Sequence, residues 1–254
     1  DRAKQWKLVD HIAKPQAFSE ALRQRCEALA ASSSRNGDKG ITLGPIHRSI
    51  DASGYHYENV DVVIDRAART ATLTVLAPRH AQPQSTAGIE AAGERWWPIA
   101  MGRELDDAIL MLRTNELSVG TWILKSRGVP EFVLAVDACI ESNRDHWLVR
   151  ETIGLLRRTL ARLDVSSRTL FAIIDRGSCF VGTLFELVLA ADRSYMLQSA
   201  DESPDAPVLT LSSLNFGVFP MPSRESRINA HYSGEQEPVE AARARIGERI
   251  GAAD

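Results

Sequence analysis

Apolar residues recur along the chain at two spacings, and these predict both helices and strands. Phe18, Leu22, Cys26 and Leu29 repeat at helical spacing, so the opening DRAKQWKLVDHIAKP leads into an amphipathic helix. SSSRNGDKG (32–40) then breaks the periodicity and predicts a linker. Beyond it, VDVVID and TATLTVLAP flank the turn DRAAR and are rich in β-branched residues, which predicts a β-hairpin.

The rest of the chain alternates between strand and helix patterns. Pro98 predicts the first turn of a helix, GTWILKS a short buried strand, and ETIGLLRRTLARLD another helix. TLFAIID is apolar throughout, as expected of a parallel strand that is covered on both faces. GSCFVGTLFELVLAAD predicts a turn into a buried helix, RSYML a further strand, and ADESPDAP an acidic loop. This order indicates an α/β fold with a largely parallel sheet.

Composition narrows the class of protein. The 254 residues are 44% hydrophobic and 25% charged, which are ordinary values for a globular protein. The formal net charge of −3 gives no basic footprint for nucleic acid, and no apolar run approaches the ~20 residues of a membrane span. Three widely spaced cysteines and six scattered histidines form no metal motif. We therefore expect a cytoplasmic protein without a metal and without nucleic-acid or membrane partners.

The segment from Ile173 to Pro220 carries the pattern with most chemical meaning. A buried strand runs into a turn of small residues, Gly177, Ser178 and Gly182, which opens a helix near Glu186. Such a turn presents backbone N–H groups at a positive helix end, where they can bind an oxyanion or a carbonyl oxygen.

Several segments, in the right order, resemble the crotonase (enoyl-CoA hydratase/isomerase) superfamily. VGTLFELVLAADRSYM resembles that family's A-L-G-G-G-x-E-L-A-x-x-C-D, LSSLNFGVFPMPS its P-E-x-x-L-G-x-x-P-G, and FVLAVD its F-x-A-G-A-D. RELDDAILMLRTNE and GTWILKSRG match the helix and strand before the first oxyanion loop. The resemblance implies a crotonase-like ββα spiral with covering helices and a CoA-thioester substrate.

Three further features resemble a ring-cleaving branch of the superfamily: WWPIAMGRELDDAILMLRTNE, DHWLVRETIGLLRRTLARLDVSSR and SCFVGT. That branch has long chains with two crotonase-like halves. It cleaves the ring of the dihydrodiol or epoxide of benzoyl-CoA with water and releases formate, in aerobic benzoate degradation. The resemblance implies a homodimer, and no cofactor beyond the coenzyme A that is part of the substrate.

The two ends resemble two copies of one family element, G-x-x-I-x-A-x-E-A-x-x-x-G-L-V-x-x-V. GERIGAAD, read as helical, supplies its first half and DRAKQWKLVDHIAKP its second half. We therefore expect an excerpt of a longer chain: residues 1–31 are the helical tail of an upstream module, 32–54 a linker, and 55–254 a second crotonase-like module without its own tail.

The resemblance also implies site residues. The two oxyanion-binding amides fall on Val136 and Thr183, with Gly182 in the turn, although the family has small residues such as Ala and Gly at these positions. The first of two catalytic glutamates matches Glu186, and the second falls on Ser213, which has no carboxylate for acid/base work. Glu186 is then either catalytic or a helix-start residue that interacts with the helix dipole.

Three functions stay open at this point. The first is part of the ring-cleaving CoA-thioester lyase, the second a non-catalytic scaffold or dimerisation half of that enzyme, and the third another crotonase such as an enoyl-CoA hydratase or isomerase. Other candidates have plainer interpretations: Cys179 and Cys139 as buried small residues, His146 as a helix-capping or surface residue, and Trp96 and Trp97 as core. For Arg157, Arg158 and Arg162, contacts to CoA phosphates and a charged solvated helix face explain the pattern equally well.

Overall fold

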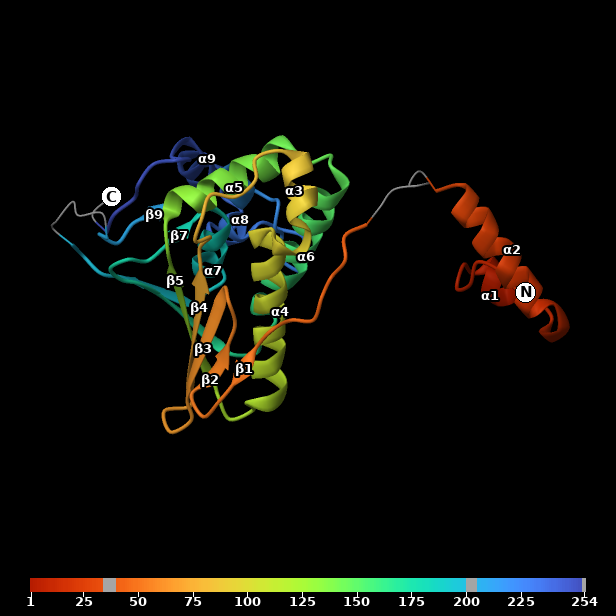
Figure 1. Cartoon of the computed structure of the whole chain (residues 1–254), viewed down its shortest axis with the longest axis horizontal. Coiled ribbons are helices and arrows are strands. Elements are labelled where there is room, and N and C mark those ends of the chain that lie inside the picture. The colour runs from red at the N-terminus through yellow and green to blue at the C-terminus, as the bar shows by residue number, and fades with distance from the viewer. Residues whose placement is uncertain (34–39, 200–204, 253–254) are drawn as a thin grey trace. The chain divides into compact units, whose positions relative to one another are not determined.

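The computed structural model describes residues 1–33, 40–199 and 205–252, and the chain divides into two compact units, 1–40 and 41–254. Unit 1 contains α1 (Arg2–Gln5), the 3-10 helix η1 (Pro15–Ala17) and α2 (Phe18–Ala31) (Figure 1). The predicted helix is confirmed, but no residue of these three elements is buried. Its apolar stripe is open, since Phe18, Leu22 and Leu29 are 57%, 54% and 53% exposed.

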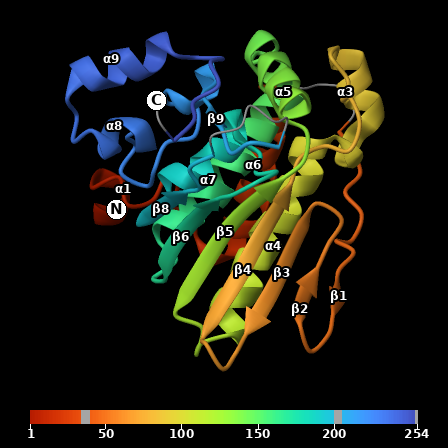
Figure 2. The ribbon, with the colours of Figure 1, turned by 90° about the vertical axis from the view of Figure 1, so that its left-hand side faces the viewer.

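Unit 2 is built on a seven-stranded sheet in the order β1-β2-β3-β4-β5-β6-β8 (Figure 2). The strands are β1 (Ser49–Ile50), β2 (Gly54–His56), β3 (Val60–Asp65), β4 (Thr70–Leu76), β5 (Thr121–Arg127), β6 (Thr169–Ile174) and β8 (Arg193–Met196). The β3–β4 hairpin predicted from the sequence is confirmed. Pairing is antiparallel from β1 to β4 and parallel from β4 to β8, so only half of the sheet has the parallel arrangement that we expected.

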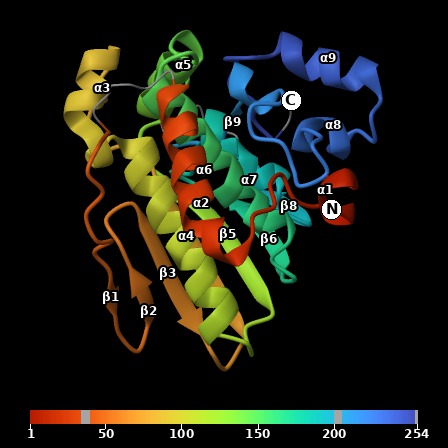
Figure 3. The same cartoon turned by 90° about the vertical axis from the view of Figure 1, so that its right-hand side faces the viewer.

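Helices follow the strands, which confirms the predicted α/β class. They are α3 (Thr86–Ala92), η2 (Gly93–Arg95), α4 (Trp97–Asn115), α5 (Pro130–Ser142), α6 (Trp147–Asp164), η3 (Gly182–Phe185), α7 (Glu186–Leu189), η4 (Ser213–Asn215), α8 (Arg227–His231) and α9 (Gln236–Ala244). A small parallel pair, β7 (Phe180–Val181) and β9 (Leu209–Thr210), lies outside the main sheet. The long helices α4 and α6 pack together and cover one face of the sheet (Figures 1 and 3).

The core lies between this helix pair and the sheet. Alternate residues of β4 and β5 are fully buried on that face, among them Leu73 and Trp122. On the other face Phe171 is only half-buried, and Tyr195 is 53% exposed. The expectation that TLFAIID is covered on both faces is therefore met fully on one face alone: Leu170, Ala172 and Ile174 are buried, whereas Phe171 and Ile173 are partly exposed.

Two further expectations about chain segments need adjustment. Residues 247–252 are not helical, because Gly247 has a φ of 83° and Ile250 forms a β-bridge with Leu209. Part of the range 32–54 folds with unit 2, since Ile41 packs against the core and β1 pairs with β2. The first five residues of the acidic loop, 200–204, lie outside the described residues. In the ranges that the structure describes, no helix has both the length and the apolarity needed to cross a membrane.

Candidate functional site

Three segments that are distant in sequence meet beside β7: helix α5, the η3 turn and the η4 turn. As predicted, the buried strand β6 leads through a turn into η3, and α7 begins at Glu186. Residues Gly182, Thr183 and Glu186, which the sequence singled out, thus lie at the centre of this junction and are all buried.

Asp137 of α5 forms the first polar group of the junction. Its side chain is only 2% exposed. Its carboxylate accepts hydrogen bonds from the Thr183 amide at 2.8 Å, from the Thr183 hydroxyl at 2.6 Å and from the Ser212 hydroxyl at 2.7 Å. Burial raises the pKa of Asp137 to about 6, although these three donors favour the charged form. The sequence reasoning missed Asp137, which is the last residue of the quoted segment FVLAVD.

Gly182 allows the carboxylate to come close to the turn. Its φ of 51° is in the left-handed region that favours glycine. A Cβ atom at this position would lie 2.1 Å from Oδ2 of Asp137. The turn therefore needs a glycine both for its backbone conformation and for the space that Asp137 fills.

This arrangement speaks against the pair of oxyanion-binding amides expected at Val136 and Thr183. The Thr183 amide is already bonded to Asp137. Val136 is buried in the middle of α5, where a residue donates its amide to the carbonyl four positions earlier in the helix. Neither amide is a free donor in the described conformation, and the roles assigned to Val136, Thr183 and Gly182 stay predictions.

Glu186 belongs to a second buried polar group, which joins three helices. Its Oε1 accepts a hydrogen bond from Asn215 at 2.8 Å, and its Oε2 lies 2.9 Å from Nη1 of Arg227. Arg227 also binds Asp164 of α6 through Nε and Nη2, at 3.0 and 2.6 Å. The side chains of Arg227, Glu186 and Asp164 are 1%, 2% and 6% exposed. A catalytic role of Glu186 would require access to substrate, whereas the described geometry gives it a buried ion pair.

Burial and charge act in opposite directions on these carboxyl groups. Burial raises the pKa of Glu186 to about 7, and Arg227 and Asn215 lower it in part. Burial also raises the pKa of Asp164, against the same guanidinium. Because one cation, Arg227, faces two buried carboxyl groups, the three side chains carry a net negative charge when both carboxyl groups are ionised.

Ser213 lies where the second catalytic glutamate was expected, and it is exposed. Its hydroxyl donates a hydrogen bond to Glu141 of α5 at 3.0 Å. Ser213 thus lies at the surface while Glu186 is enclosed, so the two positions do not present a pair of acid/base groups to one solvent-accessible space.

The plainer interpretation is confirmed for the two cysteines and the two tryptophans. Cys179 is fully buried, and burial raises its pKa to about 12. Cys139, Trp96 and Trp97 are buried as well. His146 directly precedes α6, but its side chain makes no capping hydrogen bond and is only 19% exposed, with Nε2 3.0 Å from Glu90, so the helix-capping or surface interpretation is not confirmed for it.

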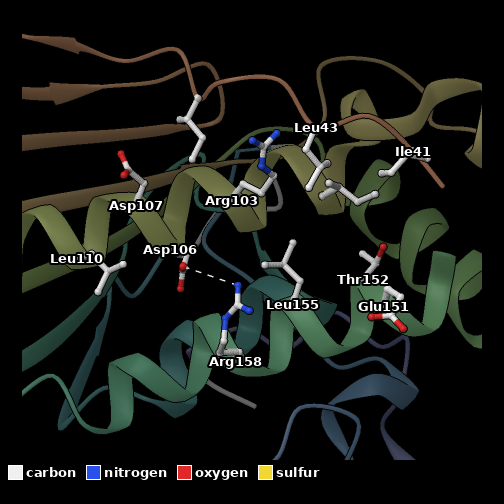
Figure 4. A pocket seen from close by; sticks show the side chains of 12 residues that line it. Ile41, Leu43, Arg103, Asp106, Asp107, Leu110, Glu151, Thr152, Leu155 and Arg158 are labelled. Atoms are coloured by element: carbon white, nitrogen blue, oxygen red, sulfur yellow. Dashed lines mark ion pairs between the residues drawn. The ribbon is translucent and has the colours of Figure 1, made fainter. Parts of the chain in front are cut away.

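A groove of about 450 Å³ runs between α4, α6 and residues 41–46 (Figure 4). Its apolar floor is edged by charged side chains, several of which already have partners. Asp106 binds Arg162 at 2.6 Å and lies 3.9 Å from Arg158. Two of the three arginines considered for CoA phosphates are therefore engaged within the chain.

A second, more polar pocket of about 420 Å³ lies beyond the carboxyl end of β4. Five basic residues line it, together with three glutamates: His47, Arg79, His80, Arg95 and Arg103, and Glu58, Glu94 and Glu104. Arg103 binds Glu94 at 2.9 Å. Among the described residues, the side chains of Arg79 and Arg95 make no ion pair, so they are available to an anionic ligand. The described residues also contain no group of three His, Cys, Asp or Glu placed to hold a metal ion.

The similarity to known proteins extends over the whole chain. All 254 residues align at 53% identity with the benzoyl-CoA-dihydrodiol lyase of Aromatoleum evansii, and the chain spans 45% of the length of that protein. This confirms the resemblance to the ring-cleaving branch that the sequence motifs indicated. No family model matches the chain.

Two solved structures are similar at lower identity. An enoyl-CoA hydratase from Bacillus halodurans is 16% identical with a TM-score of 0.47, over 77% of this chain and 68% of that one. An enoyl-CoA hydratase/isomerase from Xanthobacter autotrophicus Py2 is 18% identical with a TM-score of 0.48, over 78% of this chain and 63% of that one.

Proposed function

Since this chain is a relative, over its whole length, of part of a benzoyl-CoA-dihydrodiol lyase, we propose that it is part of a lyase acting on the same CoA thioester. The identity of 53% is the observation that carries the proposal. In the proposed reaction, water opens the ring of the dihydrodiol or epoxide of benzoyl-CoA and formate is released. A homodimer, a cytoplasmic location and the absence of a metal or redox cofactor remain predictions from the resemblance.

The polar pocket next to β4 is the part of unit 2 best suited to the phosphates of coenzyme A. It lies at the carboxyl end of a parallel strand, where α/β sheets commonly bind ligands. Arg79 and Arg95 line it without an ion pair of their own among the described residues, and arginine binds phosphate through paired N–H groups. By contrast, the groove of Figure 4 offers paired charges over an apolar floor.

A specific observation favours a supporting role for this stretch within the lyase. Both groups that the resemblance assigns to chemistry are engaged internally: the Thr183 amide by Asp137 and the Glu186 carboxylate by Arg227. An oxyanion hole works because its donors are free to bind the charge that develops on the substrate. The stretch then contributes structure and CoA contacts, and the reacting groups lie elsewhere in the protein.

Formate release by the full-length protein tests both parts of the proposal. Wild type incubated with the dihydrodiol of benzoyl-CoA should release formate, and a failure to do so would overturn the lyase assignment. Glu186→Gln should keep a rate close to wild type per folded molecule at saturating substrate, with Glu240→Gln as an exposed control. A fall of ~100-fold or more in a folded Glu186→Gln protein would instead place acid/base chemistry in this stretch.

A further inference from the structure

The Asp137 carboxylate is held in the way that oxyanion sites hold a substrate oxygen. Its donors are one backbone amide and two hydroxyl groups, at 2.8, 2.6 and 2.7 Å. No lysine, arginine or histidine in the described ranges forms an ion pair with it, so oriented dipoles alone act against the burial that raises its pKa. Preorganised dipoles of this kind offset part of the cost of burying an anion.

The turn is also shaped around a carboxylate oxygen. Gly182 lies so close to Oδ2 of Asp137 that no side chain fits between them. Ser212 is fixed from the other side, because its amide donates to Asn215 at 2.9 Å and its hydroxyl also accepts from the Leu214 amide at 3.3 Å. The donors are thus held in place by the η3 and η4 turns as well as by Asp137.

We propose that Gly182, Thr183 and Ser212 form an anion site whose resident ligand is the chain's own Asp137, and that the site accepts a small free carboxylate when that side chain is shortened. In the wild-type chain the site is closed, so it does not bind the oxygen of a substrate carbonyl. The inference goes beyond the lyase assignment and does not depend on it, because it concerns binding of a simple anion.

Asp137→Ala removes a group with the size and charge of formate and leaves its three donors in place. We expect sodium formate to raise the melting temperature of this variant saturably, relative to sodium chloride at equal ionic strength. At tenfold its Kd the expected rise is about 3–6 °C. Wild type and Asp137→Asn, in which the space stays filled, should show no such difference between the two salts.

A double variant that lacks one of the donors distinguishes formate binding at this site from general salt effects. Adding Ser212→Ala to Asp137→Ala removes one of the three donors and should weaken formate binding about tenfold, the loss expected for a hydrogen bond to a charged group. Formamide, which is similar in size but neutral, should not stabilise either variant. Equal stabilisation by formate and chloride in Asp137→Ala would overturn the proposal.

If Asp137→Ala does not fold in the absence of formate, a refolding experiment tests the proposal instead. The denatured variant is then diluted into buffer containing either formate or chloride, and native circular dichroism is recorded. Recovery in formate and none in chloride supports the proposal, whereas the same lack of recovery in both salts contradicts it. The lyase assignment is judged separately by formate release from wild type.

Discussion

Nη1 of Arg227 lies 2.9 Å from Oε2 of Glu186, in an ion pair that is almost completely shielded from solvent. The same guanidinium reaches Asp164 and the carbonyl of Phe219. One side chain of α8 is therefore the common partner of α6, α7 and the segment before α8. Its removal leaves two carboxylates buried without a cation.

We expect Arg227→Met to lower the free energy of unfolding by about 3–5 kcal/mol, because breaking a buried pair leaves uncompensated charge. Urea unfolding followed by circular dichroism measures the change. Arg245→Met is the matched control: Arg245 pairs with Glu248, with side chains 37% and 55% exposed, and should cost no more than about 1 kcal/mol. Equal losses in the two variants would contradict a structural role of the buried network.

Alanine substitutions at two glycines should distinguish the cost of a steric conflict from the cost of backbone strain. Gly182→Ala places a methyl group against Asp137 and keeps a left-handed φ, so it should cost at least ~3 kcal/mol. Gly177→Ala has a φ of 71° but nothing within 4 Å of the new methyl group, so it should cost only about 1–2 kcal/mol. Thermal unfolding of both variants gives the comparison, and a tolerated Gly182→Ala would show that the turn does not hold Asp137 as described.

The buried carboxyl groups give stability a defined pH dependence. The pKa of Asp137 rises from 3.8 to about 6 on folding, so the folded protein binds this proton more tightly than the unfolded chain. The contribution is complete below pH ~4 and is lost as the pH rises towards 7. The free energy of unfolding of Asp137→Asn relative to wild type should therefore increase between pH 4 and 8, by ~3 kcal/mol for a shift of about two pKa units.

The carboxyl group of Asp51 should give the free energy of unfolding the opposite pH dependence, which Asp51→Asn tests in the same experiment. Hydrogen bonds from Ser53 hold the pKa of Asp51 at about 2, well below its usual 3.8. Its contribution is therefore present above pH 4 and is lost as the pH falls towards 2. A pH profile of Asp137→Asn that runs parallel to wild type would show that Asp137 has the same pKa in both states.

The three cysteines should differ sharply in reactivity. Cys26 is exposed, whereas Cys139 and Cys179 are buried and burial raises the pKa of both thiols. Because the thiolate is the reactive form, a disulfide reagent such as DTNB should titrate one thiol in the native protein and three after denaturation. Cys26→Ser should abolish the native reaction, and fast modification of Cys179 would contradict its placement.

Much of the fold could be predicted from local patterns. The β3–β4 hairpin, the helix beginning near Pro98 and the strand TLFAIID all follow from the spacing of apolar residues and from turn residues. The partial exposure of the second face of β6 could not be predicted, because periodicity reports which residues are apolar and not which layers cover them. The prediction that GERIGAAD is helical is wrong for its described residues, since a β-bridge from Ile250 to Leu209 overrides the local pattern.

The candidate site was predicted only in part. The turn with Gly182, Thr183 and Glu186 came from a local motif together with the family resemblance. Asp137 and Arg227 were missed, because their partners are 46 and 41 residues away and no local spacing indicates them. One indication was present in the sequence, because FVLAVD aligns with a family segment that also ends in Asp.

The hydrogen bonds of Asp137 have a kinetic consequence. They connect positions 46 and 75 residues apart, so each one closes a long loop of chain. Contacts of this range carry a large entropic cost and tend to form late, after the hairpin and the neighbouring strands have paired. Asp137 then acts chiefly on the barrier to unfolding: a chain without this carboxylate reaches the native state at a similar rate but leaves it sooner.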